Sequence, residues 1–304
     1  MRNALTLLRN WFVATRPHTL SAGVVPVLVG TAVAVSGGAF EGHLLALVLV
    51  ASILVQIGAN LTDEFADHDA TASARKYLAP HKVIKRGLLS AGAVRWGAVV
   101  AFGAATLIGV YLVWRTGWPL LVVCLVSLGV AYGYSAGPFP LGHAALGEAL
   151  VFVVMGPLMV GATEYVQRGA VSGEGLWLSL SVAALVTAIL VVNNLRDEAE
   201  DRAHGRRTTV TLFGALRVRA VYLVLVVAAF LVPLGPLALG LRTGWMFLPW
   251  FTLPLAAIVT RRVLISTDRD LLHFCLRATS VLHLLFGLLL ALAVLGDWAF
   301  RGTP

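Results

Sequence analysis

Two short acidic motifs contain the residues with the clearest capacity for chemistry. The first runs from Asn60 to Asp67 and reads NLTDEFAD, and the second runs from Asn194 to Asp201 and reads NLRDEAED. The motifs match at five of eight positions, and all but one of the matched residues are polar. Solvation of a loop gives no reason for such a pattern to recur. We therefore interpret the two motifs as an internal repeat with a shared function.

Helical geometry would bring the polar residues of each motif together, because residues three and four positions apart share a face of a helix. These residues are Asn60, Asp63, Glu64 and Asp67 in the first motif, and Asn194, Asp197, Glu198 and Asp201 in the second. Carboxylates at this spacing repel one another, so each cluster should attract cations. Hard oxygen ligands favour Mg²⁺ or Ca²⁺ over zinc, and Mg²⁺ typically combines one or two carboxylates with phosphate oxygens of a substrate.

Basic residues follow each acidic motif. They are Arg75, Lys76, Lys82, Lys85 and Arg86 after the first, and Arg202, Arg206 and Arg207 after the second. A metal can neutralise some oxygens of a diphosphate while Lys and Arg side chains neutralise the others. The pattern therefore predicts a site for a metal-bound diphosphate. For any single charge, a solvated position in a loop remains the alternative.

The composition predicts a membrane protein. Hydrophobic residues make up 59% of the 304-residue chain and charged residues 12%, whereas soluble domains have about 45–50% and about 25%. This excludes an ordinary soluble protein, a disordered chain and a small disulfide-stabilised scaffold. The net charge of +8 is explained by basic cytoplasmic loops, so it does not indicate a nucleic acid partner.

Nine apolar runs have the length of membrane-spanning helices, about 20 residues each. They cover 19–39, 43–61, 96–114, 118–135, 144–163, 176–194, 218–236, 244–260 and 278–296. With the N-terminus in the cytoplasm, 19 of the 23 Lys and Arg residues lie inside, as the positive-inside rule requires. We expect an all-α bundle of nine transmembrane helices with a cytoplasmic N-terminus, forming one domain over residues 1–304. The segments 62–95 and 195–219 then face the cytoplasm.

The first 17 residues are expected to form an amphipathic helix on the membrane surface. Arg9 and Arg16 interrupt the apolar core that a secretory signal would need. The residues expected to face the lipid are Leu5, Leu8, Trp11 and Phe12.

Three further residues lie near the cytoplasmic ends of the predicted spans. Glu148 is an acid within the fifth span, and an ionisable residue in a span is a functional candidate. Tyr134 ends the fourth span and His18 precedes the first. Each of the three either contacts a substrate or occupies an ordinary position at the membrane interface.

The chain resembles the UbiA superfamily of membrane prenyltransferases over about residues 12–214. It is most similar to the menaquinone-pathway branch, the 1,4-dihydroxy-2-naphthoate polyprenyltransferases. The supporting stretches are RPHTL from Arg16, QIGANL from Gln56, YSAGP from Tyr134 with Gly147-Glu148, and NNLRD from Asn193 followed by DR and GRRT. The family usually has Asn-Asp where this chain has Asp63-Glu64. Asp69 is the candidate substitute for a further family aspartate, and the branch commonly has Lys at the position of His18.

The resemblance implies a multi-pass protein of the cell membrane that transfers a polyprenyl group from polyprenyl diphosphate to an aromatic acceptor resembling dihydroxynaphthoate. Its cavity would open to the cytoplasm and to the lipid bilayer. The implied cofactor is Mg²⁺, with the ligands Asn60, Asp63, Glu64, Asp67, Asp197 and Asp201, of which the five acids are catalytic. The implied substrate-binding residues, besides Asn60, are Lys82, Arg86, Asn194, Arg196, Arg206, His18, Tyr134 and Glu148.

Other functions remain open from the sequence. Secondary transporters also contain repeats and intramembrane acids, but their sites lie near the middle of the membrane, whereas these acids lie at the ends of the spans. A membrane phosphatidyltransferase would be expected to contain a DG-x-x-AR stretch, and none is present. Within the superfamily, the alternatives are a 4-hydroxybenzoate, haem-type or chlorophyll-type acceptor, or a lipid.

Overall fold

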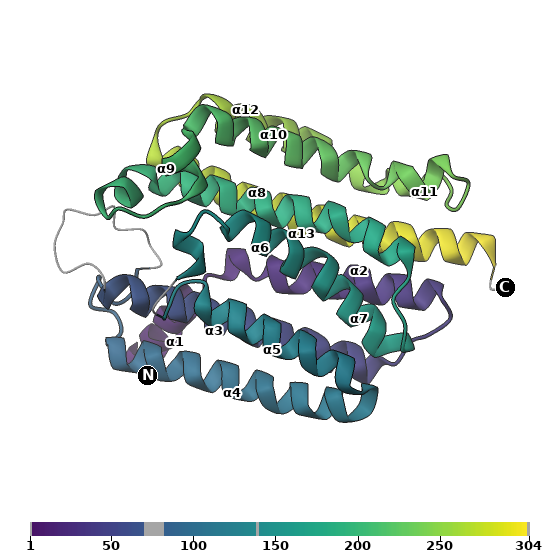
Figure 1. Cartoon of the computed structure of the whole chain (residues 1–304), viewed down its shortest axis with the longest axis horizontal. Helices are drawn as coiled ribbons and strands as arrows, with labels where there is room; N and C mark the ends of the chain where they lie inside the picture. Colours follow the sequence, from purple (N-terminus) through teal and green to yellow (C-terminus); the bar gives the residue numbers. More distant parts are fainter. Residues whose placement is uncertain (1, 70–81, 138–139, 303–304) are drawn as a thin grey trace.

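The computed structural model describes residues 2–69, 82–137 and 140–302, and its regular elements are helices (Figure 1). Eight of the described helical segments are long and apolar enough to cross a membrane. A further apolar helix, Trp118–Gly133, is shorter and matches the predicted span over 118–135. The expected all-α, multi-pass membrane architecture is therefore confirmed, and each of the nine predicted apolar runs overlaps a helix.

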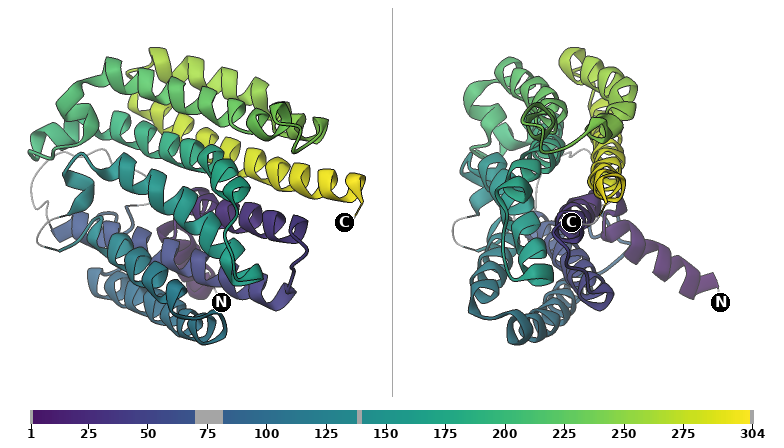
Figure 2. Two further views of the ribbon diagram at one scale, coloured as in Figure 1. Left: turned by 45° about the vertical axis from the view of Figure 1, so that its right-hand side comes forward. Right: turned by 90° about the vertical axis from the view of Figure 1, so that its right-hand side faces the viewer.

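In chain order, the elements are α1 (Arg2–Ala14), η1 (Pro17–Thr19), α2 (Ser21–Ser36), α3 (Gly42–Asp69), α4 (Ala91–Thr116), α5 (Trp118–Gly133), η2 (Leu141–His143), α6 (Gly147–Val153), η3 (Val154–Leu158), α7 (Met159–Arg168), α8 (Gly173–Ala203), α9 (Thr209–Phe213), α10 (Ala215–Leu231), α11 (Leu234–Ala238), η4 (Gly244–Thr252), α12 (Leu253–Ile265) and α13 (Arg269–Arg301). The helices run roughly along one direction of the bundle, and α1 projects from it (Figure 2).

The centre of the bundle is formed by helices that are apolar around most of their circumference, as expected for helices without a solvent-facing side. Helices α2, α8 and α13 contribute Val25, Leu185 and Leu282 to one large buried cluster, which α10 and α12 extend. A second cluster joins α1 to α3 and α4. There Trp11 packs against this cluster rather than facing the lipid as expected.

Helices α3 and α8 are longer than the bilayer core is thick. Their 28 and 31 residues extend about 42 and 46 Å, against about 30 Å of hydrocarbon. Neither acidic motif contains a Gly or Pro that would end its helix. The helices therefore continue through both motifs, as the spacing of the polar residues required. Both motif-bearing ends lie at the same end of the bundle (Figure 1).

The span between Gly147 and Arg168 is not a uniform α-helix. A turn of π-helix occupies Val154–Leu158 and includes Pro157, which cannot donate a backbone hydrogen bond. Gly156 allows close approach to α8, since an added Cβ there would overlap Ala183. This irregular turn directs Val154 and Met155 into the cavity described next.

Candidate functional site

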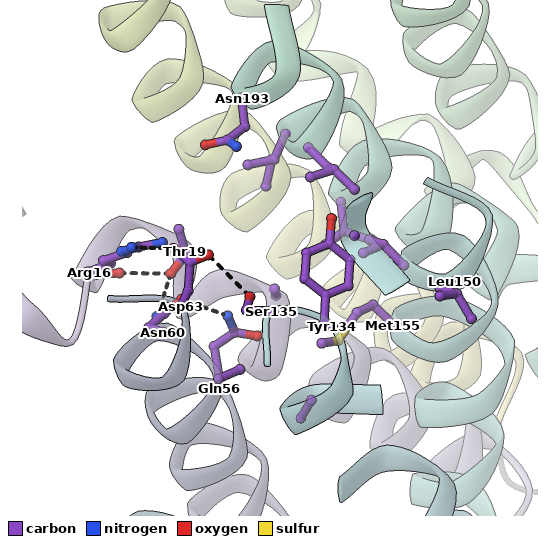
Figure 3. Close-up of a pocket in the computed structure, with 18 of the residues that line it drawn as sticks. Arg16, Thr19, Gln56, Asn60, Asp63, Tyr134, Ser135, Leu150, Met155 and Asn193 are labelled. Carbon is purple, nitrogen blue, oxygen red and sulfur yellow. Dashed lines mark hydrogen bonds and ion pairs between the residues drawn. The ribbon is translucent and has the colours of Figure 1, made fainter. Parts of the chain in front are cut away.

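Residues of both acidic motifs line one cavity of about 280 Å³, and Figure 3 shows part of its lining. Its volume is close to the lower limit of typical small-molecule sites, about 300 Å³. Its rim is polar, while its depth is lined by apolar residues of α5, α6, α7 and α8, including Val130, Leu150, Met159, Val186 and Leu190. A cavity with charges at its mouth and hydrocarbon below suits a ligand with a charged head and an apolar tail.

Asp63 and Asp67 of the first motif lie on the rim of the cavity. The Arg16 guanidinium lies 2.5 Å from Asp63 Oδ2, and the Ser135 hydroxyl donates to Asp63 Oδ1 at 3.1 Å. Asp67 accepts from Lys82 Nζ on one oxygen and from Arg206 Nη2 on the other, both at 2.5 Å. Each aspartate of this motif is therefore neutralised by at least one cation.

Arg206 connects the two motifs across the cavity. Besides Asp67, its guanidinium contacts Asp201 of the second motif, with Nη1 3.5 Å from Oδ1. Burial alone would lower the pKa of Arg206, but its hydrogen bond to the Asp67 carboxylate and the negative charges of Asp67 and Asp201 raise it. Arg206 therefore stays charged at neutral pH and lies where an anionic group between the two aspartates would bind.

The rest of the second motif is held from α8 itself and from α13. Arg196 donates to both oxygens of Asp197, at 2.8 and 2.6 Å, and to the side-chain Oδ1 of Asn193 at 2.8 Å. Its Nη1 is 3.3 Å from Nδ1 of His273 on α13. Arg196, Asp197 and Asp201 all line the cavity, so both ends of the internal repeat contribute to one site.

His18, Asn60, Asn194 and Tyr134 also line the cavity. The Tyr134 ring lies against two glycines: a Cβ on Gly142 would come 2.7 Å from ring atom Cε1, and one on Gly147 would come 2.7 Å from the hydroxyl. Because neither glycine has a Cβ, the Tyr134 ring fits into the cavity wall (Figure 3). The phenol of Tyr134 can donate a hydrogen bond.

Three of the residues expected at the site, Glu64, Glu148 and Arg86, lie outside the cavity lining. Glu64 is 2% exposed and accepts the backbone N–H of Ile84 at 3.0 Å, so it fixes the segment that carries Lys82. The sequence also drew attention to Asp69, Arg75 and Lys76. The Asp69 side chain and residues 70–81 lie outside the described residues.

Glu148 lies behind the cavity wall, where it joins three segments of the chain. One of its oxygens accepts hydrogen bonds from Asn194 on α8, at 2.8 Å, and from the Thr209 hydroxyl at the start of α9. Because Asn194 itself lines the cavity, this position suits a residue that orients the second motif rather than one that touches a ligand.

Several polar residues of the site were not selected as candidates from the sequence, among them Arg16, Ser135 and Gln56. Gln56 lies one turn before Asn60 on the same face of α3, and it lines the cavity. Its amide nitrogen donates to Asn60 Oδ1 at 3.3 Å (Figure 3). The available signal was its spacing of four residues from Asn60.

The donor set fits Mg²⁺ in combination with a phosphate ligand. Among the residues that the structure describes, no three acidic, His or Cys side chains converge as a complete metal cage. Mg²⁺ does not need such a cage, because it typically binds one or two carboxylates and takes further oxygens from phosphate and water. The aspartates on α3 and α8 supply the carboxylate ligands. Arg16, Lys82 and Arg206 supply positive charge that can neutralise the phosphates.

A second hollow, of about 930 Å³, adjoins the site between α3, α4 and α5. It shares Asp63, Asp67 and Arg206 with the cavity. These three charged residues therefore border open space on two sides of α3.

Comparison of the sequence with known proteins gives consistent matches. The sequence profile of the UbiA prenyltransferase family matches residues 23–281. The 1,4-dihydroxy-2-naphthoate octaprenyltransferase of Bacillus subtilis is 27% identical over 281 residues, which cover 92% of this chain and 90% of that protein. The protein of the same description from Mycobacterium leprae is 30% identical over 258 residues, covering 83% and 85%.

Solved structures show the same fold at low sequence identity. A UbiA homologue from Aeropyrum pernix superposes with a TM-score of 0.67 at 16% identity, covering 92% of this chain and 98% of that one. A UbiA homologue from Archaeoglobus fulgidus, bound to GPP and Mg²⁺, gives a TM-score of 0.65 at 15% identity, covering 94% and 99%.

Proposed function

This chain belongs to the UbiA prenyltransferase family of enzymes, and on that premise we propose that it transfers a polyprenyl group from polyprenyl diphosphate to 1,4-dihydroxy-2-naphthoate with Mg²⁺ as cofactor. The main support is the contact of Arg206 with Asp67 and Asp201, because it brings both acidic motifs to the mouth of one apolar cavity. The relatives described as 1,4-dihydroxy-2-naphthoate octaprenyltransferases support the choice of acceptor.

The diphosphate would bind between α3 and α8. Mg²⁺ would be held by Asp63 and Asp67 on one side and by Asp197 and Asp201 on the other, and when bound it neutralises charge on the departing diphosphate oxygens. Lys82 and Arg206 are paired with aspartates in the structure. With diphosphate present, the same side chains would donate charge-assisted hydrogen bonds to its oxygens.

The reaction would proceed by cleavage of the allylic C1–O bond, with the electron pair leaving on the diphosphate. Lys82 and Arg206 would stabilise that charge. The apolar wall below the rim would keep water from the allylic cation, and the Tyr134 ring would offer it an electron-rich face. A carbon of the acceptor ring then bonds to C1, and the group that this carbon carried leaves so that the ring regains its aromaticity. That group would be a proton at an unsubstituted carbon, or CO₂ at the carboxylate-bearing carbon of a dihydroxynaphthoate.

In the proposed topology the chain crosses the cell membrane nine times. The shorter helix α5 is counted as a span in addition to the eight long ones, and both motifs lie on the cytoplasmic side. On helix α1, Leu5, Leu8 and Phe12 are exposed, as an interfacial helix requires. A cysteine placed at exposed Arg202 should react with an impermeant thiol reagent only after the cells are permeabilised. One at exposed Leu239 should react in intact cells, and the reverse pattern would contradict this topology.

Product formation by isolated membranes tests the proposed function. Membranes containing the chain, Mg²⁺ and a radiolabelled polyprenyl diphosphate should convert 1,4-dihydroxy-2-naphthoate to a labelled lipid, and chelation of Mg²⁺ should stop the reaction. A panel that includes 4-hydroxybenzoate tests the acceptor. Transfer to 4-hydroxybenzoate alone would retain the reaction type and replace the acceptor, while transfer to none of the aromatic compounds would contradict the proposal.

A further inference from the structure

We propose that Gln56 recognises a hydroxyl group of the aromatic acceptor, an inference that rests on the proposed prenyl transfer. Gln56 lines the cavity from α3, one helical turn before Asn60. Its Oε1 atom is buried and has no hydrogen-bond partner within the part of the chain that the structure describes. Figure 3 shows the side chain beside Asn60, whose amide oxygen it contacts.

The orientation of the Asn60 amide is fixed by its neighbours. Its nitrogen donates to the Thr15 carbonyl oxygen at 2.8 Å, and a carbonyl can only accept. The same nitrogen donates to the Thr19 hydroxyl at 2.9 Å. The Thr19 hydroxyl in turn donates its own proton to the Arg16 carbonyl oxygen at 2.9 Å. Both amide protons of Asn60 therefore have acceptors, and its oxygen faces Gln56.

The Asn60 oxygen then determines how Gln56 is oriented. Only the nitrogen of the Gln56 amide can donate to Asn60 Oδ1, and it does so at 3.3 Å. The opposite orientation would place two amide oxygens against each other. Among the described residues, no donor then reaches Gln56 Oε1, which is a buried acceptor in the wall of the cavity. Such an unpaired buried acceptor destabilises the site until a donor reaches it.

The two substrates differ in what they can offer this oxygen. A polyprenyl tail is a hydrocarbon and contains no N–H or O–H group. An ionised diphosphate offers only acceptor oxygens. The hydroxyls of a dihydroxylated aromatic ring are donors, so the acceptor is the substrate whose chemistry matches Gln56 Oε1.

The depth of Gln56 agrees with this assignment. It precedes Asp63 by seven residues, about 10 Å along the helix toward the centre of the bilayer. With the diphosphate at the level of the aspartates, prenyl C1 lies just below the rim and the attacking ring lies beside C1. The long side chain of Gln56 reaches toward that level. Its terminal torsion is soft, so a small rotation presents Oε1 to a ring hydroxyl.

Ligand binding to Gln56→Met tests the inference, because Met has a similar length but lacks the acceptor oxygen. The probes are 1,4-dihydroxy-2-naphthoate and the two analogues that each lack one ring hydroxyl. The wild-type protein should bind the dihydroxy compound about ten-fold more tightly than one of the analogues. Gln56→Met should lose about ten-fold in affinity for the dihydroxy compound and should no longer distinguish it from that analogue.

The matched control is Ile57→Met, which changes the next residue, one that packs toward α1 and α4 rather than into the cavity. This variant should bind all three probes like the wild type. Polyprenyl diphosphate should bind both variants within two-fold of the wild type, which shows that the site is folded.

Several results would overturn the role of Gln56. One is an equal loss of affinity for all three probes in Gln56→Met. Another is no loss of affinity in this variant, as expected if only an ordered water binds Oε1. The third is that no probe binds the wild-type protein. Binding with the expected discrimination but without prenylated product would instead overturn the proposed reaction and retain the recognition by Gln56.

Discussion

Asp67→Asn is expected to lower kcat/KM for prenyl transfer by roughly a hundred-fold or more, because it removes a charged metal ligand and the anionic partner of two cations. In the structure, Asp67 contacts Lys82 with one oxygen and Arg206 with the other. The neutral amide keeps the size of the side chain but not its charge. Initial rates measured over a range of Mg²⁺ concentrations would show both the lower maximum and a higher Mg²⁺ requirement.

Asp268→Asn is the matched control for this change. Asp268 immediately precedes α13 and caps it by accepting the backbone N–H of Leu271 at 2.7 Å. Asparagine caps a helix about as well, so activity should stay within two-fold of the wild type. Near-normal turnover of Asp67→Asn at limiting Mg²⁺ would exclude Asp67 from the metal site.

Arg206→Gln is expected to have two effects of opposite sign. Binding of polyprenyl diphosphate should weaken by roughly ten-fold to a hundred-fold, because charge-assisted hydrogen bonds to the diphosphate are lost. Binding of Mg²⁺ without substrate should become tighter, because the guanidinium that covers Asp67 and Asp201 is removed and two carboxylates remain. Calorimetric titration of the purified protein with each ligand separately measures both effects.

The neighbouring variant Arg207→Gln serves as the control for Arg206→Gln. Arg207 is exposed, lies in the same connection and carries the same charge, but it does not line the cavity. Its replacement should leave both affinities within two-fold of the wild type. Weakening of both ligands by Arg206→Gln would indicate general damage to the site rather than removal of a competing cation.

Much of the site could be predicted from the sequence because it depends on local helix geometry. The spacing of Asn60, Asp63 and Asp67 places them on one face of any helix that continues through the motif, and they do line the cavity. The recurrence of the pattern in the second motif predicted that both helix ends serve one function. The apolar runs predicted the helices themselves, since their length and composition leave few other structures in a bilayer.

What the sequence did not predict depends on contacts between residues far apart in the chain. Glu64 shares a helix face with Asn60 by spacing, but its buried side chain accepts the backbone N–H of Ile84 instead of lining the cavity. Glu148 had the expected position near the site, yet its partners come from α8 and from Thr209. That Gln56 Oε1 has no partner among the described residues follows only from the positions of Thr15 and Thr19, which orient Asn60.

The central claim is that the two acidic motifs form one Mg²⁺-dependent diphosphate site. A double-mutant cycle of Asp67→Asn and Asp201→Asn, with binding of a polyprenyl diphosphate measured with and without Mg²⁺, tests it most directly. We predict that binding requires Mg²⁺, that each single variant loses most of it, and that the double variant loses little more than either single one. Losses that add independently in the double variant, or binding that is indifferent to Mg²⁺, would contradict a shared site.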